Sequence, residues 1–180
     1  MPRPVQPLPD QPLAIKLLNT TWSGDGGVVD LLADRDDVAR WLASVGSTAQ
    51  ATEPLCEALR AARDAIEAVA RNPADPAALR QLNALLARGT ITRSLTSDGT
   101  AAREVTVDDA WQPGWLAADD LLEILAAHPD RIRQCAHPRC VLWFLDTSRN
   151  ASRRWCSMAG CGNRSKAQQH YHRRRKASVR

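Results

Sequence analysis

Apolar residues recur at intervals of three and four positions in five segments of the first 130 residues. A stripe with this spacing forms one face of a helix, which is typical of helices that pack on a shared core. The predicted helices span residues 13–22, 35–45, 54–71, 76–88 and 115–127. Their predicted core side chains are Leu13, Leu17, Leu18, Val38, Trp41, Leu42, Val45, Leu55, Leu59, Ala62, Ile66, Val69, Leu79, Leu82, Leu85, Leu86, Trp111, Trp115, Leu116, Leu121, Leu122, Ile124 and Leu125.

Residues that favour helix ends stand at several of these boundaries. Asp34 and Asp75 precede the second and fourth helices, where a carboxylate can accept from free backbone N–H groups. Gly46 and Gly89 follow the same two helices, in the position where glycine commonly ends a helix. These positions support the predicted boundaries. A loop is expected at residues 23–27, which read Ser-Gly-Asp-Gly-Gly.

Between the fourth and fifth helices the apolar period changes from 3.6 to two. Residues 91–96 and 103–107 are rich in β-branched side chains and flank the turn sequence Ser-Asp-Gly-Thr, which predicts one small antiparallel hairpin. The expected fold class is α+β, mainly α. We expect a flexible, proline-rich lead-in at residues 1–12, a helical domain at 13–130 and a separate module at 131–180.

Charge divides the chain at the same place. Residues 131–180 contain 13 Lys or Arg and a single acid, Asp146, and carry a net charge of +12. Residues 1–130 contain 11 basic and 19 acidic side chains and carry −8. A body at +12 attracts polyanions. We therefore expect residues 131–180 to bind nucleic acid, even without the acidic part.

Composition and motifs narrow the classes of protein. No uncharged apolar run approaches the roughly 18 residues of a membrane span, and the first residues lack the apolar stretch of a signal peptide. We therefore expect a cytoplasmic protein with no membrane partner. The chain has no phosphate-binding glycine loop, no His-Glu-x-x-His and no nucleophile with a base nearby. We do not expect an enzyme.

Four of the five cysteines form two close pairs in the basic part. Cys135 and Cys140 are separated by four residues, as are Cys156 and Cys161, and fifteen residues lie between the pairs. In a chain without a secretory signal, this spacing favours a structural Zn²⁺ site over two disulfides. His137, inside the first pair, is the main alternative ligand; the fifth cysteine, Cys56, is expected in the helical core.

The order of elements around these cysteines predicts a treble-clef-like zinc finger. A strand is expected at residues 141–146, a return strand at 153–155 and a basic helix at about 163–176. The Gly162 and Asn163 amides, at the start of that helix, are expected to donate to a thiolate sulfur. A zinc ion held by four thiolates has no open position, so its expected role is structural.

Side chains suited to nucleic acid follow and flank the cysteines. Asn163, Arg164, Gln168 and Gln169 can read base edges, whereas the basic run at 173–176 suits phosphates. DNA is the expected partner; RNA, stacked on Trp143 or Tyr171, and an acidic protein partner stay open. A homodimer would provide operator-length recognition. The predicted contact residues are Arg153, Arg154, Asn163, Arg164, Lys166, Gln168, Gln169, Arg173, Arg174, Arg175 and Lys176.

Four residues of the helical part are candidates for a ligand pocket. Asn19, Thr20, Trp22 and Asn83 are polar or amphipathic side chains on or beside faces that are otherwise apolar. A small-molecule effector could satisfy their polar groups. The alternative is that these side chains bond to the backbone at helix ends.

The sequence around the second cysteine pair resembles the CGNR zinc-finger family. The similarity covers roughly residues 131–175 and includes both cysteine pairs, Arg154-Trp155 and the Cys-Gly-Asn-Arg motif at 161–164. In that family the finger usually follows an ABATE domain, and residues 17–20, 30–34 and 41–42 resemble that domain. The resemblance implies a bacterial, stress-induced transcription regulator.

Overall fold

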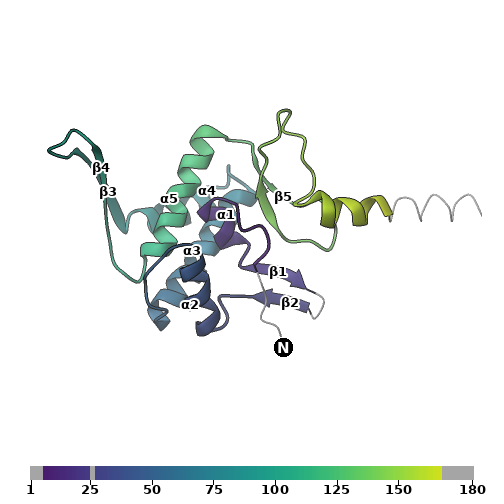
Figure 1. The fold of residues 1–180 in the computed structure, drawn as a ribbon, viewed down its shortest axis with the longest axis horizontal. Coiled ribbons are helices and arrows are strands. Elements are labelled where there is room, and N and C mark those ends of the chain that lie inside the picture. Colours follow the sequence, from purple (N-terminus) through teal and green to yellow (C-terminus); the bar gives the residue numbers. More distant parts are fainter. Residues whose placement is uncertain (1–5, 25–26, 168–180) are drawn as a thin grey trace, which may run out of the picture.

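Five helices form the body of the molecule in the computed structural model, which describes residues 6–24 and 27–167 (Figure 1). The mainly helical α+β class is confirmed. No helix in these residues combines the length and apolar content needed to cross a membrane. The helices are α1 (Leu13–Leu18), α2 (Arg35–Ser44), α3 (Glu53–Arg71), α4 (Pro76–Leu86) and α5 (Gln112–Ala127).

Three of the predicted helix ends are confirmed by their capping residues. The Asp34 carboxylate accepts from the backbone N–H groups of Asp36 and Asp37 at 2.9 and 3.1 Å. Asp75 accepts from the Ala77 N–H at 2.9 Å. Gly46 has a φ of +76° just after α2, a conformation that glycine adopts without strain. These contacts fix where α2 and α4 begin and where α2 ends.

The prediction that Gly89 ends α4 is wrong. Gly89 is the first residue of strand β3 (Gly89–Leu95) and lies against the Trp115 indole of α5. A Cβ atom at this position would be 2.7 Å from Cε2 of that ring. Close packing, rather than a helix end, therefore requires glycine here.

The predicted apolar faces account for most of the core. The stripe of α3 is buried throughout, as is the inward face of α2. Two predictions are wrong, because Leu79 on α4 and Leu122 on α5 are 40% and 41% exposed. These two helices instead bury small residues, Ala78 on α4 and Ala117 and Ala118 on α5. The alanines, and not the two leucines, therefore lie on the buried faces of α4 and α5.

The first predicted helix ends early and the expected glycine-rich loop is part of a hairpin. Strand β1 (Thr21–Gly24) pairs antiparallel with β2 (Gly27–Asp30), with Trp22 opposite Val29. Cross-strand contact between these large side chains stabilises a hairpin that the glycines conceal in the sequence.

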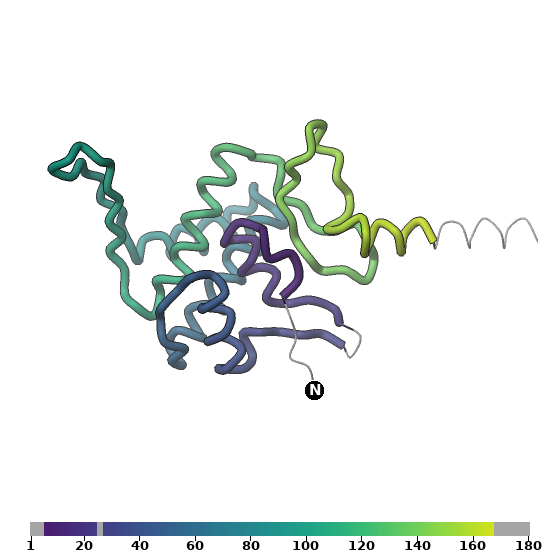
Figure 2. Tube along the Cα trace, viewed as in Figure 1, coloured from purple at the N-terminus to yellow at the C-terminus, as the bar shows by residue number. Residues whose placement is uncertain are grey.

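The second hairpin is confirmed where the sequence predicts it. Strand β3 pairs with β4 (Ala101–Val107), and Ile91 lies opposite Val105. Figure 2 shows this hairpin projecting from the body at the end opposite the C-terminal module.

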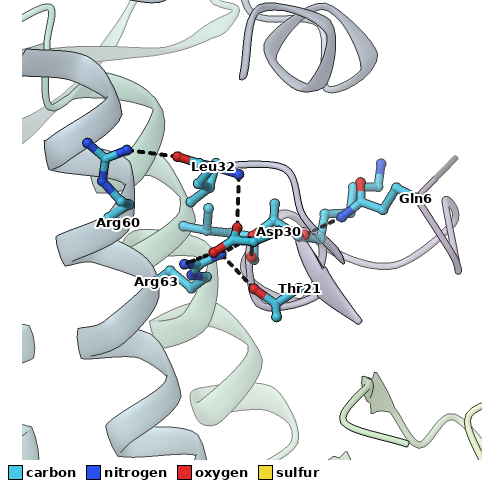
Figure 3. A network of polar contacts seen from close by, with 9 residues as sticks. Gln6, Thr21, Asp30, Leu32, Arg60 and Arg63 are labelled. Atoms are coloured by element: carbon cyan, nitrogen blue, oxygen red, sulfur yellow. Dashed lines mark hydrogen bonds and ion pairs between the residues drawn. The ribbon is translucent and has the colours of Figure 1, made fainter. Parts of the chain in front are cut away.

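A polar network ties the first hairpin to α3 (Figure 3). Arg63 donates to both Asp30 carboxylate oxygens at 2.6 and 2.9 Å, and to the hydroxyls of Thr20 and Thr21. Burial alone raises the pKa of Asp30, but hydrogen bonds from Arg63 and the Leu32 N–H, with the nearby positive charge, lower it overall. The network therefore favours the ionised carboxylate.

We predict that Arg63→Met lowers the free energy of unfolding by about 2–3 kcal/mol at pH 7, because it leaves the Asp30 carboxylate without its partner. The lowered pKa makes the contribution of Asp30 fully present above its unfolded value of about 3.9. It is lost as the pH falls from that value through the lower folded value, so the difference between variant and parent should begin to shrink below about pH 4 and vanish below the folded pKa. Urea denaturation at several pH values measures this loss in the free energy of unfolding.

Arg40→Met, which removes an exposed pair with Asp37, is the control and should lower the free energy of unfolding by about 0.5 kcal/mol. Equal losses in the two variants would contradict the prediction.

Candidate metal centre and basic face

A short hairpin presents the first two cysteines. Strand β5 (Ile132–Gln134) pairs antiparallel with β6 (Trp143–Leu145). Cys135 follows β5 directly, and its N–H donates to the Leu142 carbonyl at 2.8 Å. The turn between the strands therefore carries both Cys135 and Cys140.

The prediction that β6 pairs with a return strand at 153–155 is wrong. Residues 153–155 are not a strand, and β5 takes the place beside β6 instead. The chain nevertheless returns, because the Ala136 N–H donates to the Arg154 carbonyl at 2.8 Å. This contact brings Cys156 next to Cys135.

Asp146 organises the loop between β6 and the second cysteine pair. Its carboxylate, 1% exposed, accepts from the Ser148 N–H and hydroxyl and from the Arg153 N–H at 2.9, 2.6 and 3.0 Å. Burial works to raise the pKa of Asp146, but these donors and the Arg133 charge hold it below its ordinary value. In the sequence, Asp146 stands out as the single acid of a basic segment, and this isolation was the signal of its role.

A π-helical turn, η1 (Met158–Gly162), carries Cys161. The predicted N–H···S contacts of Gly162 and Asn163 are wrong, because both amides donate to carbonyl oxygens within this turn. The N–H of Cys156 donates to the Cys135 sulfur instead, at 3.4 Å. A Cβ atom at Gly162 would lie 2.8 Å from Sδ of Met158, so this exposed and flexible side chain would have to move.

The four sulfur atoms form one cluster, in which all lie within 4.8 Å of one another. The Cys140–Cys156 and Cys156–Cys161 sulfur distances are 3.8 and 3.7 Å, and the cysteines form no disulfide. Four thiolates around Zn²⁺ at 2.3 Å would be about 3.8 Å apart. The cluster is therefore a metal-ion site whose donors fit zinc.

The close approach of the four sulfurs also shifts the pKa values of the cysteine thiols. The hydrogen bond from the Cys156 thiol lowers the pKa of Cys140 to about 5. Its hydrogen bond to Cys140 in turn raises the pKa of Cys156, and burial raises that of Cys161 to about 11. One thiolate thus suppresses ionisation of its neighbours, and a divalent cation would replace their protons.

His137 lies outside the cluster of four sulfurs. It is 2% exposed, and its Nδ1 accepts from the Arg139 N–H at 3.3 Å, which stabilises the turn between Cys135 and Cys140. The fifth cysteine, Cys56, is buried in the helical core, as predicted.

Four of the predicted nucleic-acid contacts are exposed around the second cysteine pair: Arg154, Asn163, Arg164 and Lys166. Residues 163–167 are helical, and the Arg154 guanidinium lies over the Trp155 ring at 5.1 Å. Two further arginines outside the predicted contact residues, Arg139 and Arg149, are also exposed on the module. The predicted residues Gln168, Gln169, Arg173, Arg174, Arg175 and Lys176 lie outside the described residues.

Arg153 is used inside the module instead. Its Nε donates to the Trp155 carbonyl at 2.9 Å, and its guanidinium also contacts the Cys156 carbonyl and lies 4.5 Å from the centre of the Phe144 ring. These contacts hold the approach to Cys156 and engage the guanidinium within the module, so Arg153 is less exposed than Arg154, Arg164 and Lys166.

The predicted ligand pocket is not assembled. Asn19 and Thr20 are fully buried with protein partners, whereas Asn83 is exposed on α4. Trp22, on β1, packs beside both apolar clusters of the molecule. Because Asn83 is on the surface and the others are satisfied or packed, the four do not line one cavity.

Comparison with known families gives two matches. Residues 131–174 match the family described as "CGNR zinc finger", and residues 11–128 match ABATE, described as "Putative stress-induced transcription regulator". No curated protein matches the chain. The two matches agree in order with the resemblances found in the sequence.

Proposed function

The chain belongs to the ABATE family and carries a CGNR zinc finger, and from this premise we propose that it is a zinc-containing, DNA-binding transcription regulator of the bacterial cytoplasm. Cys135, Cys140, Cys156 and Cys161 would hold the zinc. Four thiolates leave no open coordination position, so we assign the metal a structural role and the protein no catalytic one.

The observation that carries DNA binding is the exposed face around η1. Arg154, Arg164 and Lys166 provide positive charge there, and Asn163 adds an amide able to pair with a base edge. Paired acids do not neutralise this face: within the described residues of the module, Asp146 is the single acid and it is buried. Polyanions are the partners that such a face favours.

Duplex DNA is favoured over single-stranded RNA by the position of one aromatic side chain. Recognition of single strands relies on exposed rings on which bases stack. Trp143, the predicted stacking residue, is only 4% exposed, and Tyr171 lies outside the described residues. Salt-dependent binding to duplex DNA distinguishes the two remaining functions, because a DNA-binding protein would show it and an adaptor for an acidic protein would not.

We predict that Arg164→Ala/Lys166→Ala weakens duplex binding at least about tenfold at 0.1 M salt and lowers the slope of log affinity against log salt by about 2. Each lost phosphate contact releases about one counterion fewer. Fluorescence anisotropy of labelled duplex at several salt concentrations measures both quantities. Arg40→Ala/Arg80→Ala removes the same charge from exposed positions of the helical domain and should leave the slope unchanged. Equal effects of the two double variants would refute the proposed face.

For the helical domain we propose a regulatory role. The feature that supports it is a cavity of about 530 Å³ at the base of the β3–β4 hairpin, a size typical of small-molecule sites. Its apolar walls include Leu13, Val45 and Leu116, and Thr48 and Gln112 offer hydrogen bonds. The wall formed by β4 adds the charged Arg103 and Glu104. An effector with an apolar body and a few polar groups fits this lining.

Gln112→Ala should then abolish the increase in melting temperature that such a compound causes in the parent protein. A domain used only for dimerisation would instead show no ligand-dependent increase, and its molecular mass in solution would depend on protein concentration.

A further inference from the structure

The zinc-finger strand β6 is completed by a side chain from the helical domain. Asn19, just after α1, donates from Nδ2 to the Trp143 carbonyl at 3.0 Å and accepts at Oδ1 from the Trp143 N–H at 2.8 Å. Both groups of one amide thus pair with both backbone groups of one residue, as a neighbouring strand would. Asn19 is fully buried, so water cannot replace these bonds.

A second side chain extends this pairing along the strand. The Gln11 Oε1 atom accepts from the Leu145 N–H at 2.8 Å. Residues Gln11 and Asn19, on either side of α1, therefore cover the edge of β6 that β5 leaves open. An uncovered edge would leave its backbone groups without partners.

Each module also packs large apolar side chains against the core of the other. Trp143 of the finger packs into the core cluster of the helical domain, where the Arg71 guanidinium lies 5.7 Å from the centre of its ring. In the other direction, Leu8 and Trp22 pack on the cluster that contains Cys135, Cys156 and Cys161. A cavity of about 190 Å³ lined by Cys140, Cys156 and Cys161 is also lined by Leu8 and Trp22. The helical part thus forms one wall of the metal site.

The two hydrogen bonds between Asn19 and Trp143, which we call the Asn19 clamp, are linked to the metal ligands through the backbone of the β5–β6 hairpin. β6 holds β5 by pairing, with Trp143 opposite Gln134, and Cys135 follows Gln134. The Cys135 N–H donates to the Leu142 carbonyl, next to Trp143. The spacing of Cys135 and Cys140 is therefore set by a hairpin whose position Asn19 fixes.

We propose that Asn19 is a positioning residue for the zinc site, and that zinc binding and docking of the finger on the helical domain are energetically coupled through it. A module of this size has too small a core to fold without its metal. Metal binding therefore includes folding of the finger and formation of the Asn19 clamp, and each part strengthens the other. This inference rests on the cysteine cluster and is independent of DNA binding.

The test is the zinc affinity of full-length variants, measured by competition with a chromophoric chelator in the absence of nucleic acid. Asn19→Ala is expected to weaken zinc binding about tenfold or more, because the buried Trp143 backbone groups lose their partners. Asn83→Ala, the same substitution at an exposed position of α4, should leave the affinity unchanged. Val38→Ala removes core volume from α2 and should lower the melting temperature without changing zinc affinity.

Cobalt substitution gives a second readout that a general loss of stability would not produce. At saturating Co²⁺, Asn19→Ala should keep the charge-transfer absorption of four thiolate ligands while requiring more metal to reach it. Zinc should also raise the melting temperature of the parent more than that of Asn19→Ala. The proposal is overturned if Asn19→Ala binds zinc as tightly as the parent, or if Val38→Ala weakens zinc binding to the same extent.

Discussion

Cys161→Ser is expected to remove the metal from the protein and to unfold the C-terminal module. The hydroxyl of serine is a poor zinc ligand, so the remaining three sulfurs leave the fourth position to water and hold the ion less tightly than the closed site of four thiolates. Metal binding supplies about 10–16 kcal/mol in small zinc modules, which exceeds what their cores provide. The loss therefore extends to the turn η1 and the exposed basic face beside it.

The measurements are metal content by atomic emission, far-ultraviolet circular dichroism and duplex affinity. Metal content should fall from one ion per chain to none and duplex binding should be lost. Most helical signal should remain because α1–α5 lie outside the module, although the helices become less stable when Trp143 leaves their core. Cys56→Ser is the matched control: Cys56 is a buried cysteine of α3, so this variant should keep its metal. A Cys161→Ser protein that retains stoichiometric metal and the duplex affinity of the parent would show that the four-cysteine assignment is wrong.

Trp143→Ala is expected to lower the free energy of unfolding of the helical domain by about 3–5 kcal/mol, the range for truncating a large buried aromatic. Trp143 belongs to the zinc finger in sequence but is 4% exposed in the core that α1, α3 and α5 build. Its removal leaves a cavity in that core and separates the finger from it. Total stabilities are only about 5–15 kcal/mol, so this loss is a large part of the whole.

Urea denaturation, followed by circular dichroism of the helices, measures the effect of Trp143→Ala. Val141→Ala is the control, because Val141 lies two residues away and is 40% exposed; it should cost less than about 1 kcal/mol. If both variants unfold at the parent's urea midpoint, the finger does not stabilise the helical domain.

The contact of Trp143 with the helical core also changes the expectation, based on charge alone, that residues 131–180 bind nucleic acid without the acidic part. Separated from the rest of the chain, these residues lose the cover of Trp143 and β6, so they should bind DNA more weakly than the whole chain.

The sequence was a good guide wherever structure depends on residues close together in the chain. Helix α3 follows its apolar period from end to end, and the Asp34 and Asp75 caps act on N–H groups two or three residues away. The β3–β4 hairpin is similar, because one turn sets its register. The cysteine spacing likewise indicated a metal-ion site, since thiolates are the donors that zinc binds in this arrangement.

Local patterns failed where the partner is distant or packing is tight. The β1–β2 hairpin was hidden because its glycine-rich turn resembles a loop. Strand β6 was given the wrong partner because β5 and the 153–155 segment are equally close to it in sequence terms. The sequence could not reveal the contacts of Arg153 with the Trp155 and Cys156 carbonyls and the Phe144 ring, because these contacts depend on the fold.

By itself, therefore, the sequence determined the helices, the distribution of charge and the four sulfur donors, because each of these is a property of composition or of spacing along the chain. Only the tertiary structure decided that Asn19 pairs with Trp143, 124 residues away, and that Trp143 enters the helical core instead of stacking on a base. An amide can satisfy a helix end, a ligand or a strand edge with the same two groups. Which of these it does is decided by the partner that folding brings within hydrogen-bond distance.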